Sequence, residues 1–384
     1  MKKIILILGI ILLSGCIGEE APPEQPPIKP PEVAEPVDDY PKIAVWLAKK
    51  DEVIASGKPY DLVMTAWFTP EEASQIRAQN PDVKLLAGLT LNWILDDEGW
   101  KTFLETVASH GREEPLELTD EMYLKENGSK CAFGWESEEW NHEEIYSMDP
   151  RSPEWKELIT SFYKNVLDQP QHDGIIVDMV TNEQWWCPEA IEGHDWSEST
   201  RGIMRDVEGL NTEDKLVIFN AGLQFQDIDL YAGHMDGYVL ENFLGSWGAD
   251  YSTGLQAADT GHYIVIYAVD TDDTGVQDMK RMRLGLTLSM LNNNTYFAYD
   301  FGPRDHGQAW WYPEYDADMG NPLGDYYYKD GAYWREFEKG VVVSSPNSDV
   351  EVVFENEHTD VTTGITSTTF TVEHGDGRIF IISE

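Results

Sequence analysis

The chain has 384 residues, with 27 Lys and Arg against 70 Asp and Glu, and so carries a formal net charge of −43. Such an acidic surface repels phosphate, which excludes general binding of nucleic acid through a basic face. Hydrophobic residues make up 41% of the chain, and 14 Trp are among its aromatic residues, so a disordered acidic chain is also excluded. The length suffices for one large domain, alone or with a small one.

The first sixteen residues have the features of an export signal. A short basic start precedes an apolar run, Ile4–Leu13, which is too short to span a bilayer and fits the core of a signal peptide. The run ends in Leu13-Ser14-Gly15-Cys16, which looks like a lipobox, where the Cys becomes the lipid-modified first residue. We expect residues 1–16 to be a lipoprotein signal peptide and Cys16 the membrane anchor. The alternative is an ordinary secretory signal with a chance Cys.

Residues 17–40 are rich in Pro and acidic residues and have no hydrophobic period. This composition predicts a semi-extended tether that holds a domain away from a membrane. The rest of the chain would then lie at the cell surface of a bacterium or archaeon, outside the cytoplasm. There, the two remaining cysteines, Cys131 and Cys187, could form a disulfide, or they could be two separate buried thiols.

Short apolar runs rich in Val, Ile and Tyr recur after residue 40. The eight runs are Ile43–Leu47, Leu62–Trp67, Val83–Trp93, Gly174–Val180, Leu216–Ala221, Gly237–Phe243, Tyr263–Val269 and Thr295–Tyr299. Because the runs are continuous and not alternating, they indicate strands buried on both faces, as in a parallel sheet.

Helical signals lie between several of these runs. Thr69-Pro70-Glu71-Glu72 has an N-cap, a Pro at the first helical position and a capping-box Glu, and Ser152-Pro153-Glu154 opens a second helix in the same way. A third helix is expected over Met279–Leu291. Alternating strands and helices predict a (β/α)8 TIM barrel over residues 41–332. An open doubly wound sheet is the alternative, but no Gly-x-Gly-x-x-Gly follows the first run.

Two segments depart from this alternation. Residues 95–148 read as an insertion or an extended loop between the third and fourth strands. Residues 333–384 contain four β-rich runs with turns and no helix between them, which predicts a small C-terminal antiparallel β domain.

Carboxylates stand where the predicted barrel strands end. The fourth run stops at Asp178, the sixth at Glu241, the seventh near Asp270 and the eighth at Asp300. Active sites of such barrels lie at the C-terminal ends of the strands, and a carboxylate after an apolar run is costly to bury without a partner or a role. Two carboxylates from different strands could cleave a glycosidic bond, one protonating the leaving oxygen and the other attacking carbon or activating water. Each could instead form a structural ion pair or cap.

Aromatic and amide side chains gather at the same predicted strand ends. Flat rings can stack on the apolar faces of sugars, and amides can bond hydroxyl groups. The predicted substrate-binding residues are Asp270 and Asp300 together with Trp67, Trp93, Asn182, Trp185, Asn220, Asn242, Trp247 and Trp311. Any single Trp could equally belong to the core.

Metal and cofactor chemistry receives little support from the sequence. The nine His are scattered, with no His-Glu-x-x-His and no paired Cys ligands. The acidic turn 270–273 could hold Ca²⁺, but a solvated loop is the favoured interpretation in so acidic a chain. We expect no metal and no cofactor.

Several motifs together resemble a known family. These are DGIIVDMV, FNAG, DGYVLENF, YFAYDFG, WWYPEYDADMGNPLGD and YWREFEKGVVVSSP, in this order. They are similar to hypothetical glycosyl hydrolase family 15, a barrel family related to endo-α-1,4-polygalactosaminidases and more distantly to α-galactosidases. The resemblance implies Asp178 as nucleophile and Glu241 as general acid/base, and it places Asp316 near the substrate end of the cleft.

The expected function is therefore a membrane-anchored extracellular glycoside hydrolase that cleaves an O-glycosidic bond in a polysaccharide or oligosaccharide by a two-carboxylate mechanism. We expect a monomer that does not bind nucleic acid. A non-catalytic carbohydrate-binding surface lipoprotein on the same scaffold is the first alternative, and a barrel that only displays loops is the second.

Overall fold

The computed structural model describes residues 40–133, 145–184, 187–211, 215–220, 231, 233–261 and 263–383. The predicted signal peptide, Cys16, most of the tether and Trp185 lie outside these residues. Within the described ranges, no helix combines the length and apolar character needed to cross a bilayer.

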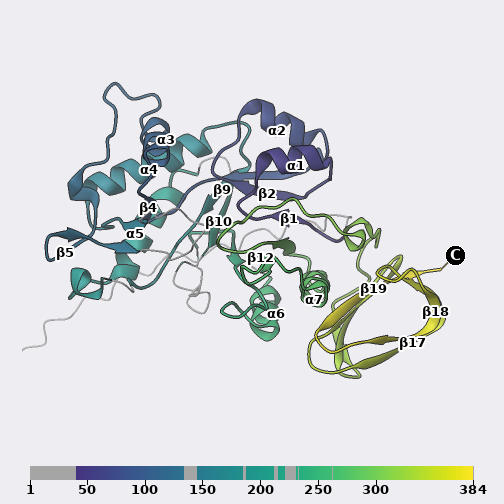
Figure 1. Ribbon diagram of the computed structural model, residues 1–384. Coiled ribbons are helices and arrows are strands. Elements are labelled where there is room, and N and C mark those ends of the chain that lie inside the picture. Colours follow the sequence, from purple (N-terminus) through teal and green to yellow (C-terminus); the bar gives the residue numbers. More distant parts are fainter. Residues whose placement is uncertain are drawn as a thin grey trace, which may run out of the picture. The chain divides into compact units, whose positions relative to one another are not determined.

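Eight parallel strands form one sheet (Figure 1). In sheet order they are β1 (Ala44–Val45), β2 (Leu62–Thr65), β3 (Lys84–Ala87), β9 (Gly174–Val177), β10 (Leu216–Asn220), β11 (Gly237–Leu240), β12 (Ile264–Asp270) and β13 (Thr295–Asp300). A parallel bridge between Ile43 and Phe297 joins the last strand to the first. The predicted (β/α)8 barrel is confirmed, and every predicted run overlaps one of its strands.

The third run was expected to be one strand but contains two. Gly88 follows β3 and passes β9 so closely that a Cβ there would lie 1.8 Å from the Ile176 carbonyl oxygen. The chain stays paired with the end of β9 through a parallel bridge between Thr90 and Asp178. It then leaves the barrel, and Trp93 begins β4 (Trp93–Leu95), which pairs with β8 (Ile145–Ser147) in a small antiparallel sheet completed by β7 (Ala132–Phe133). Trp93 therefore does not belong to a barrel strand.

The helix signals agree with the observed helix starts. Thr69 and Glu72 form the predicted capping box, with Glu72 N donating to Thr69 Oγ1 (3.2 Å) and Thr69 N to Glu72 Oε2 (2.8 Å). Ser152 Oγ accepts from Trp155 N (3.2 Å) at the next predicted helix. The helices are α1 (Lys50–Ser56), α2 (Pro70–Arg77), α3 (Glu98–Ala108), α4 (Pro153–Leu167), α5 (Trp196–Glu208), α6 (Tyr251–Asp259) and α7 (Met279–Ser289).

The insertion between β3 and β9 is a folded excursion from the barrel. Besides α3 and the small antiparallel sheet, it contains the hairpin of β5 (Lys125–Glu126) and β6 (Ser129–Lys130). Helix α4 then leads back to β9, and it packs against α3 and α5.

The C-terminal part is a six-stranded antiparallel sheet, as the sequence predicted in kind. Its order is β14 (Tyr327–Lys329), β15 (Ala332–Phe337), β16 (Gly340–Ser345), β19 (Asp376–Ile382), β17 (Val350–Asp360) and β18 (Thr366–Val372). Four of these strands, β16 to β19, correspond to the predicted runs. The two additional strands, β14 and β15, form a tight hairpin that turns at the Asp330-Gly331 pair.

Helix α7 lies between the barrel and this sheet (Figure 1). A Cβ at Gly285 would lie 2.6 Å from Val269 of β12, and a Cβ at Gly377 of β19 would lie 1.9 Å from Thr287 Oγ1. The two glycines permit close contact on both sides of the helix. Arg283 also donates to both carboxylate oxygens of the fully buried Asp376 at 2.8 Å.

Candidate active site

Asp178 is the first residue after β9, and its position is tightly fixed. Its peptide N–H donates to Leu89 O and its C=O accepts from Leu91 N, both at 3.0 Å. Its Oδ1 accepts from Met179 N at 2.8 Å. Met179 has φ +57°, a left-handed conformation that is strained for a side chain of this kind and turns the chain sharply after the carboxylate.

Asn220 connects Asp178 to Glu241. It is the last residue of β10, the strand between β9 and β11, and only 1% of it is exposed. Its Nδ2 donates to Asp178 Oδ1 at 2.9 Å and to Glu241 Oε2 at 2.6 Å. Because the two bonds share one nitrogen, these oxygens lie at most 5.5 Å apart, the sum of the bond lengths. The structure thus brings together Asp178, Asn220 and Glu241, all predicted site residues.

His306 completes the group and was missed by sequence reasoning. Its Nε2 lies 3.2 Å from Glu241 Oε1, and its Nδ1 lies 2.9 Å from Asp300 Oδ2, which also accepts from Gly307 N (3.0 Å). His306 lies in the loop after β13, far in sequence from Glu241, and no motif marks it. The only available signal was a histidine six residues after a strand-end carboxylate.

The surroundings separate the proton affinities of the two carboxyl groups. Burial, followed by the charge of Glu241, raises the pKa of Asp178 to about 6. Burial would also raise the pKa of Glu241, but the hydrogen bond and charge of His306, with the Asn220 amide, hold it below its usual value. Burial opposes a charge on His306, yet Asp300 and Glu241 raise the pKa of its imidazole well above the ordinary value. Such a divided pair of carboxyl groups is typical of acid and base assignments in enzymes.

A family model matches residues 77–341, which contain all of these side chains. The chain belongs to hypothetical glycosyl hydrolase family 15. Membership identifies it as a carbohydrate-active enzyme of the glycoside hydrolase class. No curated protein sequence matches the chain.

Solved structures with a similar fold are also glycoside-acting enzymes. A maltogenic α-amylase from Thermotoga neapolitana aligns with a TM-score of 0.50 and 9% identity, over 87% of this chain and 93% of its own. An isomalto-dextranase from Arthrobacter globiformis complexed with panose has a TM-score of 0.49 and 11% identity, over 90% and 72% of the two chains. An α-galactosidase from Thermus thermophilus has a TM-score of 0.46 and 13% identity, over 75% and 61%. At these identities, the likeness concerns the fold.

In this family 15 chain, the predicted residues Asn242, Asp270 and Asp300 border the same group. Asp270 and Asp300 are paired neighbours at the ends of β12 and β13. Asn242 Nδ2 donates to Asp270 Oδ1 (2.7 Å) and to Asp272 Oδ1 (2.9 Å), while its Oδ1 accepts from the backbone of Trp247 (3.0 Å) and Gly248. All polar atoms of the Asn242 side chain are used in ordering the loop after β11, which carries the half-buried Trp247.

Asp270 is nearly fully buried, and its Oδ2 has no hydrogen-bond partner among the described residues. Burial raises the pKa of this carboxyl to about 7. The acidic turn that follows is held by Arg281, which contacts Asp272 at 2.5 Å. In the described part of the chain, no cluster of three His, Cys, Asp or Glu side chains is arranged to hold a metal ion.

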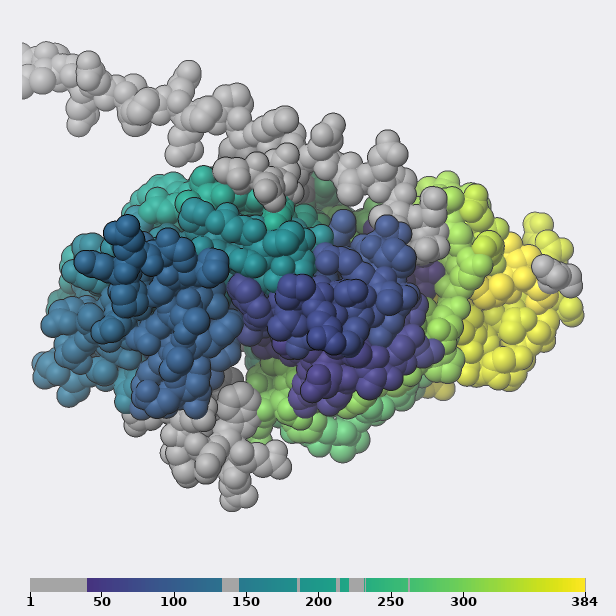
Figure 2. Space-filling view, turned by 90° about the horizontal axis from the view of Figure 1, so that it is seen from above, coloured from purple at the N-terminus to yellow at the C-terminus, as the bar shows by residue number. Residues whose placement is uncertain are grey.

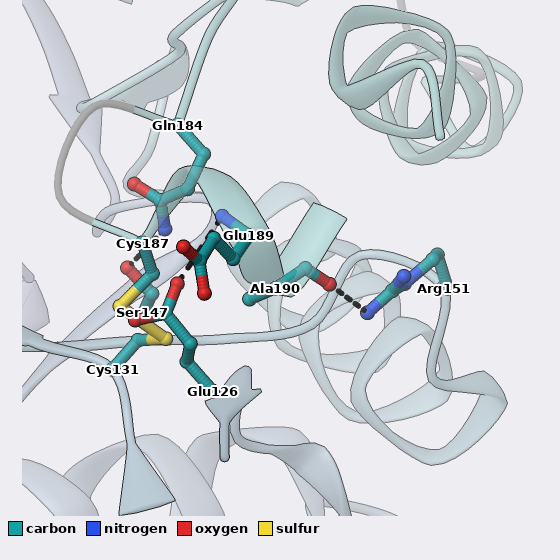
Figure 3. The surroundings of a disulfide bond; sticks show 8 residues. All are labelled: Glu126, Cys131, Ser147, Arg151, Gln184, Cys187, Glu189 and Ala190. Carbon is teal, nitrogen blue, oxygen red and sulfur yellow. Dashed lines mark hydrogen bonds between the residues drawn. A yellow bond between two sulfur atoms is a disulfide. The ribbon is translucent and has the colours of Figure 1, made fainter. Parts of the chain in front are cut away.

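A disulfide ties the loop after β9 to the excursion (Figure 3). Cys131 and Cys187 are joined with a Cα–Cα distance of 6.1 Å. Beside them, Gln184 Nε2 donates to Ser147 Oγ (2.7 Å), and Glu189 N donates to a Glu126 carboxylate oxygen (3.2 Å). The predicted residue Asn182 lies buried within this loop, and the predicted Trp185 falls outside the described residues.

Trp67 follows β2 and lines an open recess of about 350 Å³. The recess lies between Lys50 at the start of α1, the end of β2 and the first half of α3. In Figure 2 the purple segment that contains α1 and the blue segment that contains α3 lie side by side on the near face. Trp100 and Phe103 form its other aromatic walls, with Lys50 and Asp97 as its charged members. Trp93, by contrast, lies in β4 with 5% of its surface exposed and does not line this recess.

The structure does not bring Trp311 and Asp316 to the carboxylate pair. Trp311 Nε1 donates to Asp316 Oδ1 (2.9 Å), and Lys58 lies 5.1 Å from the Trp311 ring and 3.7 Å from Asp316. The Tyr60 ring lies 5.1 Å from that of Trp311. Lys58 and Tyr60 precede β2, at the opposite end of the strands from Asp178. The chain after His306 therefore runs back along the barrel wall, which the sequence did not reveal.

Proposed function

We propose that this family 15 chain is a surface-anchored glycoside hydrolase that cleaves an O-glycosidic bond in an extracellular polysaccharide, with Asp178 and Glu241 as the reacting pair. The observation that carries the proposal is the Asn220 amide shared by the two carboxyl groups at the ends of β9 and β11. A pair bridged in this way from neighbouring strands fits a reaction centre better than two independent surface acids.

The spacing supports retention of anomeric configuration. Retaining enzymes hold their two carboxyl groups about 5–5.5 Å apart, whereas inverting enzymes need about 6.5–9.5 Å to admit a water molecule. The bridging oxygens here are at most 5.5 Å apart. One carboxylate would attack the anomeric carbon while the other protonates the leaving oxygen, and water would then release the sugar from the covalent intermediate.

A panel of polysaccharides, including galactosaminoglycans and α-galactans, tests the activity through the appearance of new reducing ends. We expect Asp178→Asn and Glu241→Gln each to lower hydrolysis at least about a hundredfold. The control Asp168→Asn changes an exposed acid paired with Lys164 at the end of α4 and should hydrolyse normally. Sugar binding without turnover, unaffected by Asp178→Asn, would instead establish a carbohydrate-binding protein.

The location is part of the proposal. The lipobox-like sequence ending at Cys16 and the Pro-rich residues 17–40 support an anchor and a tether that keep the barrel outside the cell. In a bacterial host, the full chain should partition into the detergent phase of Triton X-114, and Cys16→Ser should move it to the aqueous phase. Equal partition of both proteins would refute lipid anchoring without bearing on catalysis.

A further inference from the structure

On the basis of the hydrolysis proposed above, we propose that His306, held by Asp300, is a positioning residue that keeps Glu241 as the carboxylate attacking the anomeric carbon, so that Asp178 is the proton donor. This assignment reverses the roles that the family resemblance implies. It follows from the hydrogen bonds that each carboxyl group makes.

The hydrogen bonds leave no convenient place for a proton on Glu241. Its Oε1 faces His306 Nε2 and its Oε2 accepts from Asn220 Nδ2, so each oxygen is engaged by a nitrogen. On Asp178, both hydrogen bonds from the described residues fall on Oδ1. A protonated carboxyl group has one O–H donor and one good acceptor oxygen. Asp178 can therefore carry a proton on Oδ2 without losing either of these two bonds, whereas protonation of Glu241 would cost it one of its own.

The imidazole has a carboxylate oxygen near each nitrogen. Both ring nitrogens can donate only in the charged imidazolium form, which the two flanking carboxylates favour. The side chains of His306, Glu241 and Asp300 are only 9%, 13% and 8% exposed, so water screens their interaction weakly. Asp300 thus has the role of orienting the ring, comparable to the third member of a catalytic triad.

The other charged and ring groups around His306 are consistent with this assignment. Asp178, directly after β9, and Asp270, at the end of β12, both interact with its charge, and the Trp46 ring lies edge-on at 6.1 Å. The imidazolium thus carries a positive charge among four strand-end carboxyl groups, and Arg281 carries another beside Asp270 and Asp272. The raised pKa of Asp178 and the lowered pKa of Glu241 have the directions that the assignment requires.

The chemical steps balance without any other reagent. A Glu241 oxygen forms a bond to the anomeric carbon as the bond from that carbon to the leaving oxygen breaks, and the Asp178 proton passes to that oxygen. Water then attacks the same carbon, gives a proton to Asp178, and releases Glu241 as a carboxylate. His306 stays protonated throughout.

Carbon-13 NMR titration of carboxyl groups in the full-length protein tests the protonation states without a substrate. We expect the Asp178 signal to titrate near pH 6 and the Glu241 signal below its ordinary range. His306→Gln keeps a side-chain N–H but removes the charge, and should raise the Glu241 midpoint by about one pH unit or more. His172→Gln, a matched change at another buried histidine, should leave both midpoints in place. A Glu241 that titrates above Asp178, or that does not respond to His306→Gln, would overturn the proposal.

Azide rescue tests the chemical roles on p-nitrophenyl α-glycosides. In Glu241→Ala, azide would replace the nucleophile and give a glycosyl azide of inverted configuration. In Asp178→Ala, it would attack the covalent intermediate and give the retained configuration. The opposite pattern would return the roles to those implied by the resemblance. If the wild-type protein turns over no glycoside or polysaccharide, the proposed function fails, while the titration still decides whether His306 controls Glu241.

Discussion

Removal of the disulfide should cost this protein a measurable part of its stability. Cys131 and Cys187 are 56 residues apart in sequence, and the loop they close includes β8, α4 and β9. The chain-entropy relation for a closed loop of this length gives about 4 kcal/mol of stabilisation. Both cysteines are buried beside Leu124 and Trp196, so Cys→Ala at both positions avoids placing a hydroxyl group in apolar surroundings.

Guanidinium chloride unfolding, followed by tryptophan fluorescence, measures this difference. With a denaturant slope of about 6 kcal/mol per molar, the midpoint of the double variant should fall by about 0.7 M. Reduction of the wild-type protein with dithiothreitol should give the same shift and should not change the double variant further. A midpoint change below about 0.2 M would refute the reasoning, because the loop would then be ordered without its covalent constraint.

Four further results follow from the structure. Asp376→Asn leaves the buried Arg283 without its charged partner and should lower the free energy of unfolding by about 3–5 kcal/mol, measured by denaturant titration. Thr69→Ala removes the capping box of α2 and should cost about 1 kcal/mol in the same assay, whereas Thr69→Ser should not. The native state binds the Asp178 proton more tightly than the unfolded chain does, so the contribution of this group to wild-type stability should be lost as pH rises from about 4 to about 6. Asp178→Asn lacks this loss, so its melting temperature relative to wild type should increase across that window, which a parallel pair of pH profiles would contradict. Finally, the net charge of −43 predicts strong stabilisation between low and molar salt, and a flat thermal-unfolding response would disprove it.

The barrel was predictable because its signals are local. Continuous apolar runs mark strands buried on both faces, and the cap residues Thr69 and Ser152 mark where two helices begin. The run Val83–Trp93 misled because β3 and β4 are both apolar and follow one another closely, so that composition alone cannot show that the chain leaves the barrel between them, after the bridge from Thr90 to Asp178.

The candidate site was predictable only in part, because strand ends leave a pattern in the sequence but the paths of the loops after them do not. Asp178, Asn220 and Glu241 occupy the ends of adjacent strands, a position that a sequence can indicate. His306 reaches Glu241 across 65 residues of intervening chain, through a loop whose path depends on tertiary packing. The same loop continues to Trp311, which contacts Tyr60 at the opposite end of the barrel strands from Asp178. The direction of a chain after its strand ends is set by such contacts and leaves no local pattern.

The burial of α7 has a consequence for how this protein can be divided. Every residue from Met282 to Ser289 is buried, on one side by the barrel and on the other by the C-terminal sheet. A fragment ending at residue 332 would expose an apolar helix to water, so we expect it to aggregate and not to behave as a free-standing catalytic module. Because α7 connects β12 to β13, whose last residues are Asp270 and Asp300, the C-terminal sheet also supports two strands of the candidate active site. A change in the sheet, remote from any sugar, could therefore alter catalysis.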